Sequence, residues 1–548
     1  MRILIIGGVA TGMSAATRLR RLDEHAEITV YEKSGNVSYA NCGLPYYLSG
    51  VIDSRAALLL QTPKSLKDRF NLDVQVNSEV LSIDLANKSI RVRNTEAGVE
   101  HTDSYDKLIV ATGARPRILQ VPGGERAIPL RNIEDVDRVK ANMDDSSEKT
   151  AVIVGSGFIG IEVAENLHEA NYKIHLVNSS KQVMGTFDPE IAEPLQKAID
   201  NAGIQMHLGV TVKEVTPTSV VLTDGQVLPA ALVINAAGIT PEVTLAKEAG
   251  LTIGETGGIW VDENHRTSDA SVYAGGDAAQ KHSFLSDNYG LIPLANLANR
   301  HGRAIADAIY GLPTGSTKSL GTSIIGAFGI ALAMTGLSEK TAKHQNIEYK
   351  VIHLHPSDHA GYYPGANAMS MKVLFDPATG LILGAQAVGA AGVDKRIDVI
   401  ATAIKGGLTI NDLMDLELTY APQFGSAKDA INQAGYLGNN VFTGKTKTIQ
   451  WDQVDEYVAA GFTLIDVRTP GEHAAGNILG SKNIEVNVMR EHLEELKDKK
   501  VVVFCQVGQR GHTATQLLQG YGIEVVNLDG GYKTWRTAMD ARERKEGK

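Results

Sequence analysis

The stretches RILIIGGVATGMSAATRLRRL at residues 2–22 and TAVIVGSGFIGIEVAENLHEA at residues 150–170 share one pattern. Each begins with an apolar run rich in β-branched residues, continues into a glycine-rich turn and ends in a run with helical spacing. In a dinucleotide-binding unit this order of strand, turn and helix directs the first backbone amides of the helix at a pyrophosphate. The duplication therefore predicts two nucleotide-binding domains, each with a parallel sheet covered by helices.

The first copy keeps the fingerprint glycines Gly7 and Gly12, but Val9 stands where the middle glycine normally lies. The next expected strand, EITVYEK at residues 27–33, supports the assignment. It places Glu32 about twenty residues past the last glycine, where a carboxylate binds a ribose hydroxyl. The first unit is therefore expected to bind the adenosine end of a dinucleotide. Because Val9 replaces the middle glycine, it is expected to bind the pyrophosphate slightly differently from a complete fingerprint.

The second copy has all three fingerprint glycines, Gly155, Gly157 and Gly160. The strand that follows, KIHLVNSSK at residues 173–181, ends in hydroxyls and Lys181 and has no acidic residue there. The missing carboxylate removes repulsion of a 2′-phosphate, yet no arginine is present to clamp one. NADH and NADPH both remain open.

Composition limits the classes of protein that fit. The 548 residues are enough for three or four domains of about 150 residues. With 53 basic and 63 acidic side chains the formal net charge is −10, and the chain lacks the basic stripe of a nucleic-acid-binding protein. The two cysteines, Cys42 and Cys505, exclude a disulfide-stapled scaffold and indicate a reducing compartment.

Two segments bear on membranes. The apolar run in MRILIIGG at the start is too short for the core of a secretory signal, so we expect a cytoplasmic protein. The stretch between Lys318 and Glu339 has twenty residues without a charge, which meets the length rule for a membrane span. Its several glycines and hydroxyl residues favour two buried strands around turns instead.

Three more expected strand ends carry small residues: KLIVATGARP at 107–116, LVINAAGITP at 232–241 and SVYAGGDAA at 271–279. With the two fingerprints, they make roughly residues 1–440 resemble the flavoprotein disulfide reductases that have two dinucleotide folds. The resemblance implies an FAD domain interrupted by an NAD(P) domain, followed by a dimerisation domain that makes a homodimer. The expected boundaries are 1–113 with 245–318 for FAD, 114–244 for NAD(P), 319–440 for dimerisation and 441–449 for a linker.

The resemblance also implies the residues that bind the two nucleotides. Asp277 of the last motif is expected to bond the ribityl chain of FAD, although an acid that caps a helix beginning near Ala278 is the plain alternative. For FAD the residues are Gly7, Gly8, Ala10, Gly12, Glu32, Lys33, Asn41, Ala111, Thr112, Gly113, Asp277, Pro293, Leu294 and Ala295. For NAD(P) they are Gly155, Gly157, Phe158, Ile159, Gly160, Glu162, Asn178, Lys181 and Gly238. Phe158 is expected to screen the flavin or to pack in the core, and Glu162 to orient nicotinamide or to lie on a helix surface.

Cys42 lies in NVSYANCGLPYYLSG at residues 36–50, before an expected short helix. A sulfur at a helix start has a lowered pKa and a nucleophilic thiolate, whereas an inert buried cysteine is the alternative. Glutathione and lipoamide reductases carry two thiols in this segment, and here there is one, so no internal disulfide can form. NADH oxidases and peroxidases of the superfamily use a histidine in the first glycine loop, where this chain has only Val9 and Ala10.

The segment instead resembles that of the coenzyme A-disulfide reductases, in which a single cysteine forms a mixed disulfide with CoA. A CoA substrate needs cations for its 3′-phosphate and pyrophosphate. Arg18 and Arg21 lie at i and i+3, so they share a helical face and could reach the same ligand, and a solvated helix face is the alternative. The resemblance implies CoA contacts from Ser14, Arg18, Arg21, Ser38, Asn41, Cys42 and, from the second subunit, Lys428. It also implies two proton-donating tyrosines of that subunit, Tyr362 in HAGYYPGAN and Tyr420 in LTYAPQFG.

Residues 450–548 alternate expected strands and helices. The segments FTLIDVRTPGEHAAGNILGSKNI at 462–484, KVVVFCQVGQRGHTATQLLQGYGI at 500–523 and LDGGYKTW at 528–535 resemble a rhodanese domain, with Asn477 in place of a common histidine. Before this domain, the polar segment GYLGNNVFTGKTKT at 435–448 is expected to be a linker.

Within that domain, Cys505 follows a buried strand and precedes a helix, so backbone amides and Arg510 are expected to form an anion cradle around its sulfur. Four residues separate Cys505 from Arg510, one fewer than in cysteine phosphatases, which indicates a smaller anion such as a persulfide. Asp466 and Arg468 are expected to brace the fold as an ion pair.

Together these features give an α/β fold of two Rossmann-like domains, an α+β dimerisation domain and a rhodanese domain. The expected activity is FAD-dependent reduction of CoA persulfide, polysulfide and CoA disulfide by NAD(P)H through a Cys42–CoA mixed disulfide, with sulfane sulfur handled at Cys505. The alternatives are a flavin NADH oxidase or peroxidase with a sulfur-sensing terminal domain and a low-turnover sulfur carrier. No metal site, nucleic acid or membrane partner is expected. The ranking of the sulfur acceptors, residual oxidase activity and the docking of the rhodanese domain stay open.

Overall fold

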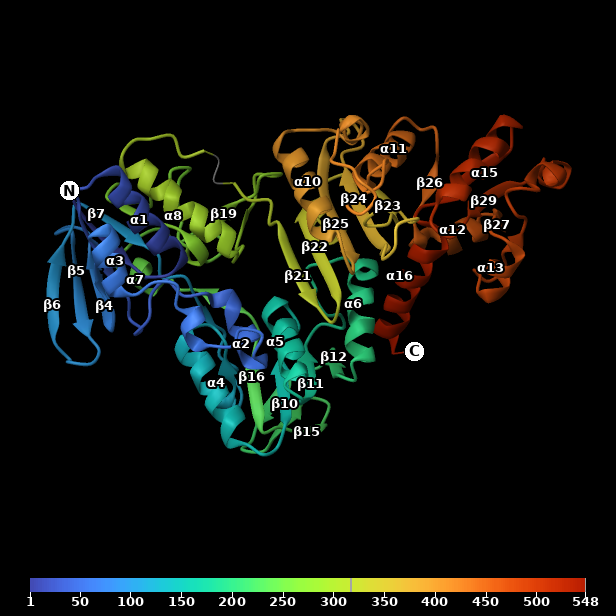
Figure 1. The fold of residues 1–548 in the computed structure, drawn as a ribbon. Coiled ribbons are helices and arrows are strands. Elements are labelled where there is room, and N and C mark those ends of the chain that lie inside the picture. Colours follow the sequence, from blue (N-terminus) through green and yellow to red (C-terminus); the bar gives the residue numbers. More distant parts are fainter. Residues whose placement is uncertain (316–317, 548) are drawn as a thin grey trace. The chain divides into compact units, whose positions relative to one another are not determined.

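The computed structural model describes residues 1–315 and 318–547 (Figure 1). Residues 316 and 317, in the second expected FAD segment, and residue 548, at the end of the expected rhodanese range, lie outside the described residues. The chain divides into two compact units, one of residues 1–180 with 204–321 and one of residues 181–203 with 322–548. Among the described residues, no helix is long and apolar enough to cross a membrane.

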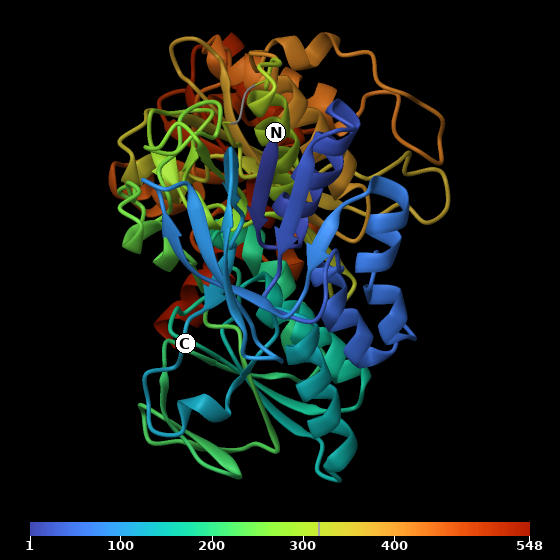
Figure 2. The same ribbon diagram turned by 90° about the vertical axis from the view of Figure 1, so that its left-hand side faces the viewer.

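The first unit contains a five-stranded parallel sheet in the order β18-β7-β1-β2-β3. Because β18 completes a sheet that begins at Arg2, the chain leaves this domain and returns to it. Helices α1 and α8 pack against each other, and Figure 2 shows α1 beside the strands of this sheet. The strands are β1 (Arg2–Ile6), β2 (Glu27–Tyr31), β3 (Asp73–Gln75), β7 (Lys107–Val110) and β18 (Val272–Ala274), and the helices are α1 (Ala10–Leu22), α2 (Leu44–Ser49), α3 (Pro63–Phe70), α7 (Thr244–Glu248) and α8 (Ala295–Ile309).

A second parallel sheet, in the order β12-β11-β10-β16-β9, lies in the same unit. Its strands are β9 (Ile128–Pro129), β10 (Thr150–Val154), β11 (Lys173–Asn178), β12 (Gln205–Leu208) and β16 (Leu232–Asn235), with helices α4 (Ile133–Asp145) and α5 (Phe158–Glu169). Antiparallel sheets are formed by β4 (Ser78–Asp84), β5 (Ser89–Asn94) and β6 (Glu100–Ser104), by β13 (Val212–Val215), β14 (Ser219–Leu222) and β15 (Val227–Pro229), by β8 (Ala114–Pro116) with β17 (Ile239–Pro241), and by β19 (Lys281–His282) with β20 (Tyr289–Gly290). Both expected nucleotide-binding folds are therefore present.

The second unit begins with an antiparallel sheet in the order β21-β22-β25-β24-β23. The uncharged stretch after Lys318 forms β21 and β22, which confirms two strands rather than a membrane helix. The strands are β21 (Ser323–Ala327), β22 (Ile330–Gly336), β23 (Lys350–Leu354), β24 (Met369–Phe375) and β25 (Ile382–Gly389), and the helices are α6 (Pro189–Asn201), α9 (Glu339–His344), α10 (Val393–Lys405) and α11 (Ala430–Phe442).

The expected linker at 435–448 is wrong in its first half, because α11 runs through it to Phe442. Asp429 begins this helix with a capping box. The glycines that suggested flexibility serve packing: a Cβ at Gly435 would lie 2.5 Å from the backbone nitrogen of Met414, and one at Gly438 would collide with Ile410. Only residues 443–447 separate α11 from the first strand of the next sheet.

The last sheet is parallel, in the order β26-β30-β29-β27-β28. Separate apolar clusters cover its two faces, as expected for a parallel sheet buried on both sides. Its elements are β26 (Thr448–Ile449), β27 (Thr463–Asp466), β28 (Lys482–Asn483), β29 (Lys500–Phe504) and β30 (Glu524–Leu528), with α12 (Val454–Ala459), α13 (Pro470–Ala475), α14 (Leu493–Leu496), α15 (Gln509–Gly520) and α16 (Gly531–Glu546).

Candidate functional site

The first glycine loop joins β1 to α1. Gly7 has φ +104°, and a Cβ there would collide with the carbonyl of Ala111, while a Cβ at Gly12 would collide with the carbonyl of Gly7. Val9, at the position of the middle fingerprint glycine, precedes α1 with φ −117°, outside the left-handed region. No side chain of the described residues caps α1, so its first amides point to the space above the loop. The loop therefore fits the pyrophosphate of FAD.

Glu32, the predicted ribose-binding acid, lies beside the first glycine loop. One of its carboxylate oxygens accepts a hydrogen bond from the Gly8 amide at 2.9 Å, and the other accepts from the amide and hydroxyl of Ser34 at 2.9 and 2.8 Å. The buried carboxylate is thus held beside the glycine loop, and the neighbouring Lys33 is exposed. This is the position that the sequence predicted for a ribose-binding acid.

The remaining predicted FAD residues follow β7 and β18 or begin α8. Strands β1, β7 and β18 are parallel neighbours, so the segments after them meet at one edge of the sheet. Asp277 lies in the turn after β18 and is half-buried. Ala111, Thr112 and Gly113 follow β7, whereas Pro293, Leu294 and Ala295 lead into α8.

Sequence reasoning missed Lys281 beside this edge. Its buried Nζ donates a hydrogen bond to the carbonyl of Gly276 at 2.6 Å, and burial lowers its pKa to about 8 while Asp277 opposes the shift. A lysine four residues after the predicted FAD aspartate was the available signal. Lys281 supports the turn that presents Asp277.

The second glycine loop has the same construction. Gly155 has φ +109°, and a Cβ at Gly160 would collide with the carbonyl of Gly155. Helix α5 begins at Phe158 after Gly157, and no side chain of the described residues caps it. Ile159 is exposed and Phe158 is half-buried in the first turn. The loop fits the pyrophosphate of NAD(P), with Asn178 at the end of β11 and Gly238 at φ +103° after β16.

Lys181, the cation predicted near a 2′-phosphate, belongs to the second unit. Its Nζ donates a hydrogen bond to the carbonyl of Lys545 at 2.9 Å, near the end of α16. One of the three ammonium donors is therefore used by the last helix of the chain.

Cys42 lies in a 3₁₀ turn, Asn41–Gly43, directly before α2. Asn41 donates a hydrogen bond to the carbonyl of Arg131 at 3.1 Å, which anchors the turn. The cysteine is exposed, yet surrounding protein desolvates its sulfur and raises the pKa of the thiol, and the carboxylates of Glu162 and Asp277 raise it further. The predicted lowering of the thiol pKa is wrong, because desolvation and two carboxylates outweigh a short helix start.

Glu162 on α5 was one of the weaker predictions. Its carboxyl is partly buried, and burial followed by the nearby Glu165 raises its pKa to about 7. The carboxylates of Glu162, on the helix of the second fingerprint, and of Asp277, in the last FAD motif, both raise the pKa of the Cys42 thiol.

The predicted CoA residues on α1 do not form a pair of free cations. Arg18 pairs through Nε with Asp307 of α8 at 2.7 Å, and the Ser14 hydroxyl donates to the side chain of Asn299 at 2.7 Å. Arg21 is exposed. Ser38 has φ +48°, and its amide donates to the Gly8 carbonyl at 2.8 Å. Of the two predicted arginines of α1, Arg18 is held by an ion pair and Arg21 is exposed.

In the second unit, the phenol oxygens of Tyr362 and Tyr420 lie 3.0 Å apart. Their loops are joined because the amide of Ala360 donates to the carbonyls of Pro422 and Gly425 at 3.2 and 3.0 Å. Tyr362 is 76% exposed and Tyr420 is 49% exposed. The predicted Lys428 is also exposed, eight residues after Tyr420. The structure therefore brings the two predicted tyrosines together on a surface.

Phe424, which sequence reasoning missed, is exposed in the same loop at 67%. An aromatic residue in the motif of Tyr420 was the available signal. Large exposed aromatic side chains mark surfaces that other protein covers, as a dimerisation domain requires.

Cys505 is fully buried at the start of the loop between β29 and α15. The amide of Gly508 donates to its sulfur at 3.1 Å, as the predicted cradle requires. The guanidinium of Arg510 forms two hydrogen bonds of 2.7 Å to Glu472, and this pairing lowers the pKa of the Glu472 carboxyl to about 2. The sequence did not indicate that Glu472 would hold the predicted anion-binding arginine.

The predicted brace is confirmed. Arg468 and Asp466 form a buried ion pair at 2.7 Å, and Arg468 lies over the ring of Tyr532 at 4.2 Å from its centroid. His473 adds a contact of 2.9 Å to the Asp466 carboxylate. These side chains hold the rhodanese-like fold and do not contact the sulfur in any described hydrogen bond.

Residues 1–302 match the pyridine nucleotide-disulphide oxidoreductase family. The chain belongs to this family. Residues 324–430 match the dimerisation domain of the same family, and residues 450–538 match the rhodanese-like domain. These matches confirm the predicted fold class and the cofactors FAD and NAD(P)H.

Relatives within this family resemble most of the chain. The coenzyme A disulfide reductase of Staphylococcus epidermidis is 32% identical over 436 residues, which are 79% of this chain and 99% of the relative. The crystal structure of reduced Bacillus anthracis CoADR-RHD has a TM-score of 0.97 at 43% identity and covers 99% of this chain and 98% of its own. An NAD-dependent persulfide reductase from A. fulgidus has a TM-score of 0.90 at 32% identity, over 98% of this chain and 100% of its own.

Proposed function

We propose that this protein reduces CoA disulfide and CoA persulfide with NAD(P)H, through FAD and a mixed disulfide between Cys42 and CoA. The observation that carries the proposal is the unpaired thiol of Cys42. Its pKa is raised by Glu162 of the second fingerprint helix and by Asp277 of the last FAD motif. The chain has no other cysteine near this segment, so the second sulfur must come from a substrate. The similarity to coenzyme A disulfide reductases and to a persulfide reductase supports CoA as that substrate.

The first step is thiol–disulfide exchange. The Cys42 thiolate attacks the CoA-side sulfur of CoA persulfide, a bond forms between these two sulfurs, and the sulfur–sulfur bond of the persulfide breaks to release hydrosulfide. With CoA disulfide, the same attack releases one CoA thiolate. FAD, when bound by the first glycine loop and Glu32, supplies the two electrons from NAD(P)H that return the mixed disulfide to two thiolates.

Residues of the chain position and protonate the substrate in this proposal. Exposed Arg21 binds a CoA phosphate, with Ser14, Arg18, Ser38 and Lys428 as the further proposed contacts. Tyr362 and Tyr420 of the second subunit of a homodimer donate a proton to the departing thiolate or hydrosulfide. Their phenols share a hydrogen bond, so one phenol can donate outward while it accepts from the other.

The rhodanese domain handles sulfane sulfur at Cys505. Its thiolate takes the outer sulfur of a persulfide or polysulfide donor, and the donor leaves as a thiolate or a shortened polysulfide. The amides of the loop, such as that of Gly508, stabilise the charge on the resulting cysteine persulfide. Sulfur passed from Cys505 to CoA would supply the substrate that Cys42 reduces.

The domain boundaries are proposed as 1–113 with 245–318, 114–244, 319–440 and 450–548. The linker expected at 441–449 is shorter in the structure, because α11 extends to Phe442 and β26 begins at Thr448. A cytoplasmic location is proposed from the two unpaired cysteines.

The test is NAD(P)H oxidation in anaerobic buffer with CoA persulfide, CoA disulfide or polysulfide as acceptor. Cys42→Ser is expected to lose reduction of all three. Cys505→Ser is expected to keep CoA disulfide reduction and to lose sulfur transfer from a sulfane donor. NADH oxidation in air without a sulfur acceptor, unchanged in Cys42→Ser, would instead identify a flavin oxidase.

A further inference from the structure

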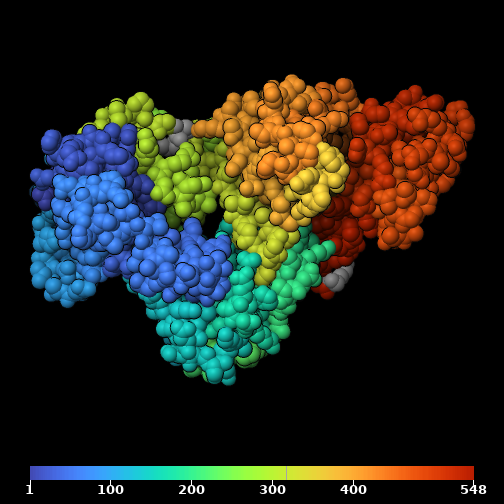
Figure 3. Space-filling view, in the orientation of Figure 1, coloured from blue at the N-terminus to red at the C-terminus, as the bar shows by residue number. Residues whose placement is uncertain are grey.

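A buried charged network in the second unit joins the rhodanese domain to the dimerisation sheet. His353 on β23 is its centre. Its backbone amide and its Nδ1 contact one carboxylate oxygen of Asp529 at 2.8 and 2.7 Å, and its Nε2 lies 3.3 Å from Glu190 on α6. These three side chains are almost inaccessible to solvent. We call these three residues the latch. Figure 3 shows the atoms of the rhodanese range, in red, packed against those of the preceding domain.

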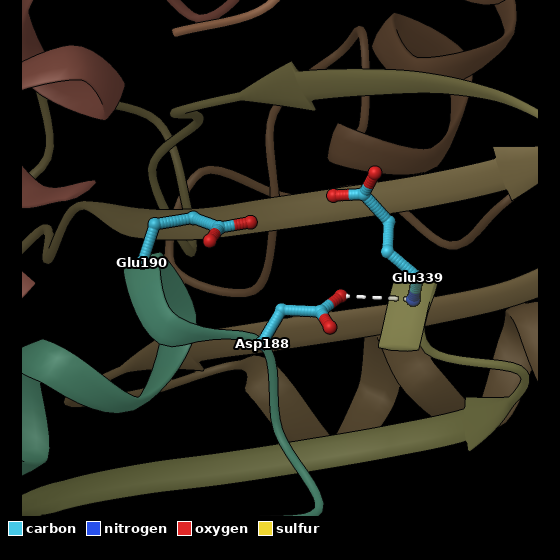
Figure 4. Close-up of side chains that lie close together, drawn as sticks. All are labelled: Asp188, Glu190 and Glu339. Atoms are coloured by element: carbon cyan, nitrogen blue, oxygen red, sulfur yellow. Dashed lines mark hydrogen bonds between the residues drawn. The ribbon is translucent and has the colours of Figure 1, made fainter. Parts of the chain in front are cut away.

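The charges around the latch require a cation at His353. Asp188, Glu190 and Glu339 have carboxylate oxygens within 4.8 Å of one another, and Figure 4 shows these three side chains. The place that a metal ion would take among them is filled by the ammonium of buried Lys372, which forms an ion pair with each. With Asp529, three buried carboxylates and the partly buried Glu339 therefore lie around one lysine and one histidine.

Burial alone would lower the pKa of His353, but hydrogen bonds to Asp529 and Glu190 raise it to about 9. His353 is therefore an imidazolium near neutral pH. The charges of the latch depend on one another. The rhodanese domain supplies the carboxylate of Asp529, and β23 of the dimerisation sheet supplies the imidazolium of His353 that neutralises it.

A short backbone path leads from the latch to the reactive loop. Asp529 is followed by Gly530 and Gly531, at φ +66° and +62°. A Cβ at Gly531 would collide with the carbonyl of Cys505. The amide of Tyr532 donates to that carbonyl at 2.7 Å, and the amide of Lys533 donates to the carbonyl of Gln506 at 3.0 Å. The segment that carries the latch aspartate therefore supports the loop that holds the sulfur.

A second contact fixes the same segment. Thr534 lies 2.8 Å from Nε2 of His355, whose Nδ1 lies 2.8 Å from the hydroxyl of Ser370. Burial lowers the pKa of His355 to about 3, so this ring is neutral and one of its nitrogens accepts a hydrogen bond. His353 on β23 and His355, just after the end of that strand, thus both hold the segment that leads into α16. His353 does so by charge and His355 by neutral hydrogen bonds.

We infer that His353 is a positioning residue for sulfur transfer at Cys505: from the dimerisation sheet, it holds Asp529 and thereby the loop that aligns the sulfur. This inference rests on the proposed sulfur transfer at Cys505. In this inference, the latch holds the rhodanese domain in one position against the dimerisation sheet. A change at β23 is therefore transmitted to a thiol that β23 does not contact in any described hydrogen bond.

The experiment uses the full-length, FAD-loaded protein, with thiosulfate as sulfur donor and cyanide as acceptor. His353→Gln and Asp529→Asn are expected to lower kcat/KM for this transfer by about tenfold or more, because small displacements of reacting groups are costly. CoA disulfide reduction by the same variants is expected to stay within about twofold of the wild type. His344→Gln, at an exposed histidine of α9, is the matched control and is expected to change neither activity.

Two further readouts separate positioning from general destabilisation. Hydrogen exchange of residues 505–512 is expected to accelerate in His353→Gln at temperatures where the circular dichroism of the chain is native. Wild-type transfer is expected to decline as pH rises through about 9, where His353 loses its proton, and His353→Gln is expected to lack this decline. The groups that act directly on His353 are Asp529, Glu190, Lys372 and His355. Further charges act on these neighbours: Asp188 and Glu339 on Lys372, Lys533 on His355, and Lys545 on Glu190.

Unchanged transfer and unchanged exchange in both latch variants would overturn the inference. A wild-type protein without thiosulfate transfer but with normal CoA disulfide reduction would instead count against the proposed role of Cys505. In that case the exchange of residues 505–512 in His353→Gln still decides whether the latch holds the loop.

Discussion

Replacement of Lys372 by methionine is expected to destabilise the second unit strongly at pH 7 and weakly at pH 5. Lys372 is fully buried and forms ion pairs with Asp188, Glu190 and Glu339. Methionine nearly conserves the side-chain length but removes the charge. The buried carboxylates then lack their cation, and one of them must take up a proton to restore the balance.

The cost follows from the proton that must be bound. The ordinary pKa of a glutamate is 4.5, about 2.5 pH units below pH 7. At about 1.36 kcal/mol per pH unit, keeping this carboxyl protonated at pH 7 costs about 3.4 kcal/mol. This value lies in the range of about 3–5 kcal/mol for removal of one partner of a buried ion pair. At pH 5 the same protonation costs only about 0.7 kcal/mol.

The pH dependence of the wild type's own stability follows from the pKa of Glu190. Burial alone would raise the pKa of Glu190, but Lys372 and His353 lower it below its ordinary value. A carboxyl with a lowered pKa stabilises the fold above its unfolded pKa, and this contribution is lost as pH falls. Between pH 7 and pH 5 the wild type keeps this contribution, because the ordinary pKa of 4.5 lies below that window. Acidification to pH 5 therefore relieves the variant alone, and the difference between the two proteins must shrink.

Urea unfolding followed by tryptophan fluorescence measures this difference. In a Trp260→Phe background the remaining tryptophans, Trp451 and Trp535, both lie in the second unit. Lys343→Met is the matched control, because Lys343 pairs with Glu339 at 3.7 Å but is exposed, and its loss should cost under about 0.5 kcal/mol. A Lys372→Met protein within about 1 kcal/mol of wild type at pH 7, or one equally destabilised at pH 5, would refute this reasoning.

Three further changes test the sites. Glu162→Gln removes a negative charge that raises the pKa of the Cys42 thiol, so alkylation of Cys42 by iodoacetamide at pH 8 should be faster than in wild type, and an equal or slower rate would contradict this. Gly160→Ala places a methyl group against the carbonyl of Gly155, so the KM for NAD(P)H in CoA disulfide reduction should rise by about tenfold or more, and an unchanged KM would show that the loop accommodates it. Glu472→Gln releases the arginine of the sulfur cradle, so the KM for thiosulfate should fall by about threefold, and a higher KM would mean that the carboxylate orients this arginine for binding.

Local features of the fold were predictable because neighbours in the chain determine them. Gly7 and Gly155 both adopt positive φ at the ends of strands, as their motifs required. The uncharged stretch after Lys318 forms two strands. The linker at 435–448 was mispredicted because glycines were interpreted as flexible, whereas Gly435 and Gly438 allow α11 to pack closely on the preceding turn. Composition alone does not separate these two uses of glycine.

The sequence by itself determined the two glycine fingerprints, the lone thiol after Glu32 and the spacing of Cys505 from Arg510, because each depends on residues close together in the chain. The tertiary structure decided the direction of the Cys42 pKa shift and the partners of Arg510 and His353. These depend on charges that the fold brings close to one another from distant segments: Asp277 raises the pKa of the Cys42 thiol, and Asp529 pairs with His353. Electrostatic energies vary with distance and burial, and sequence separation specifies neither.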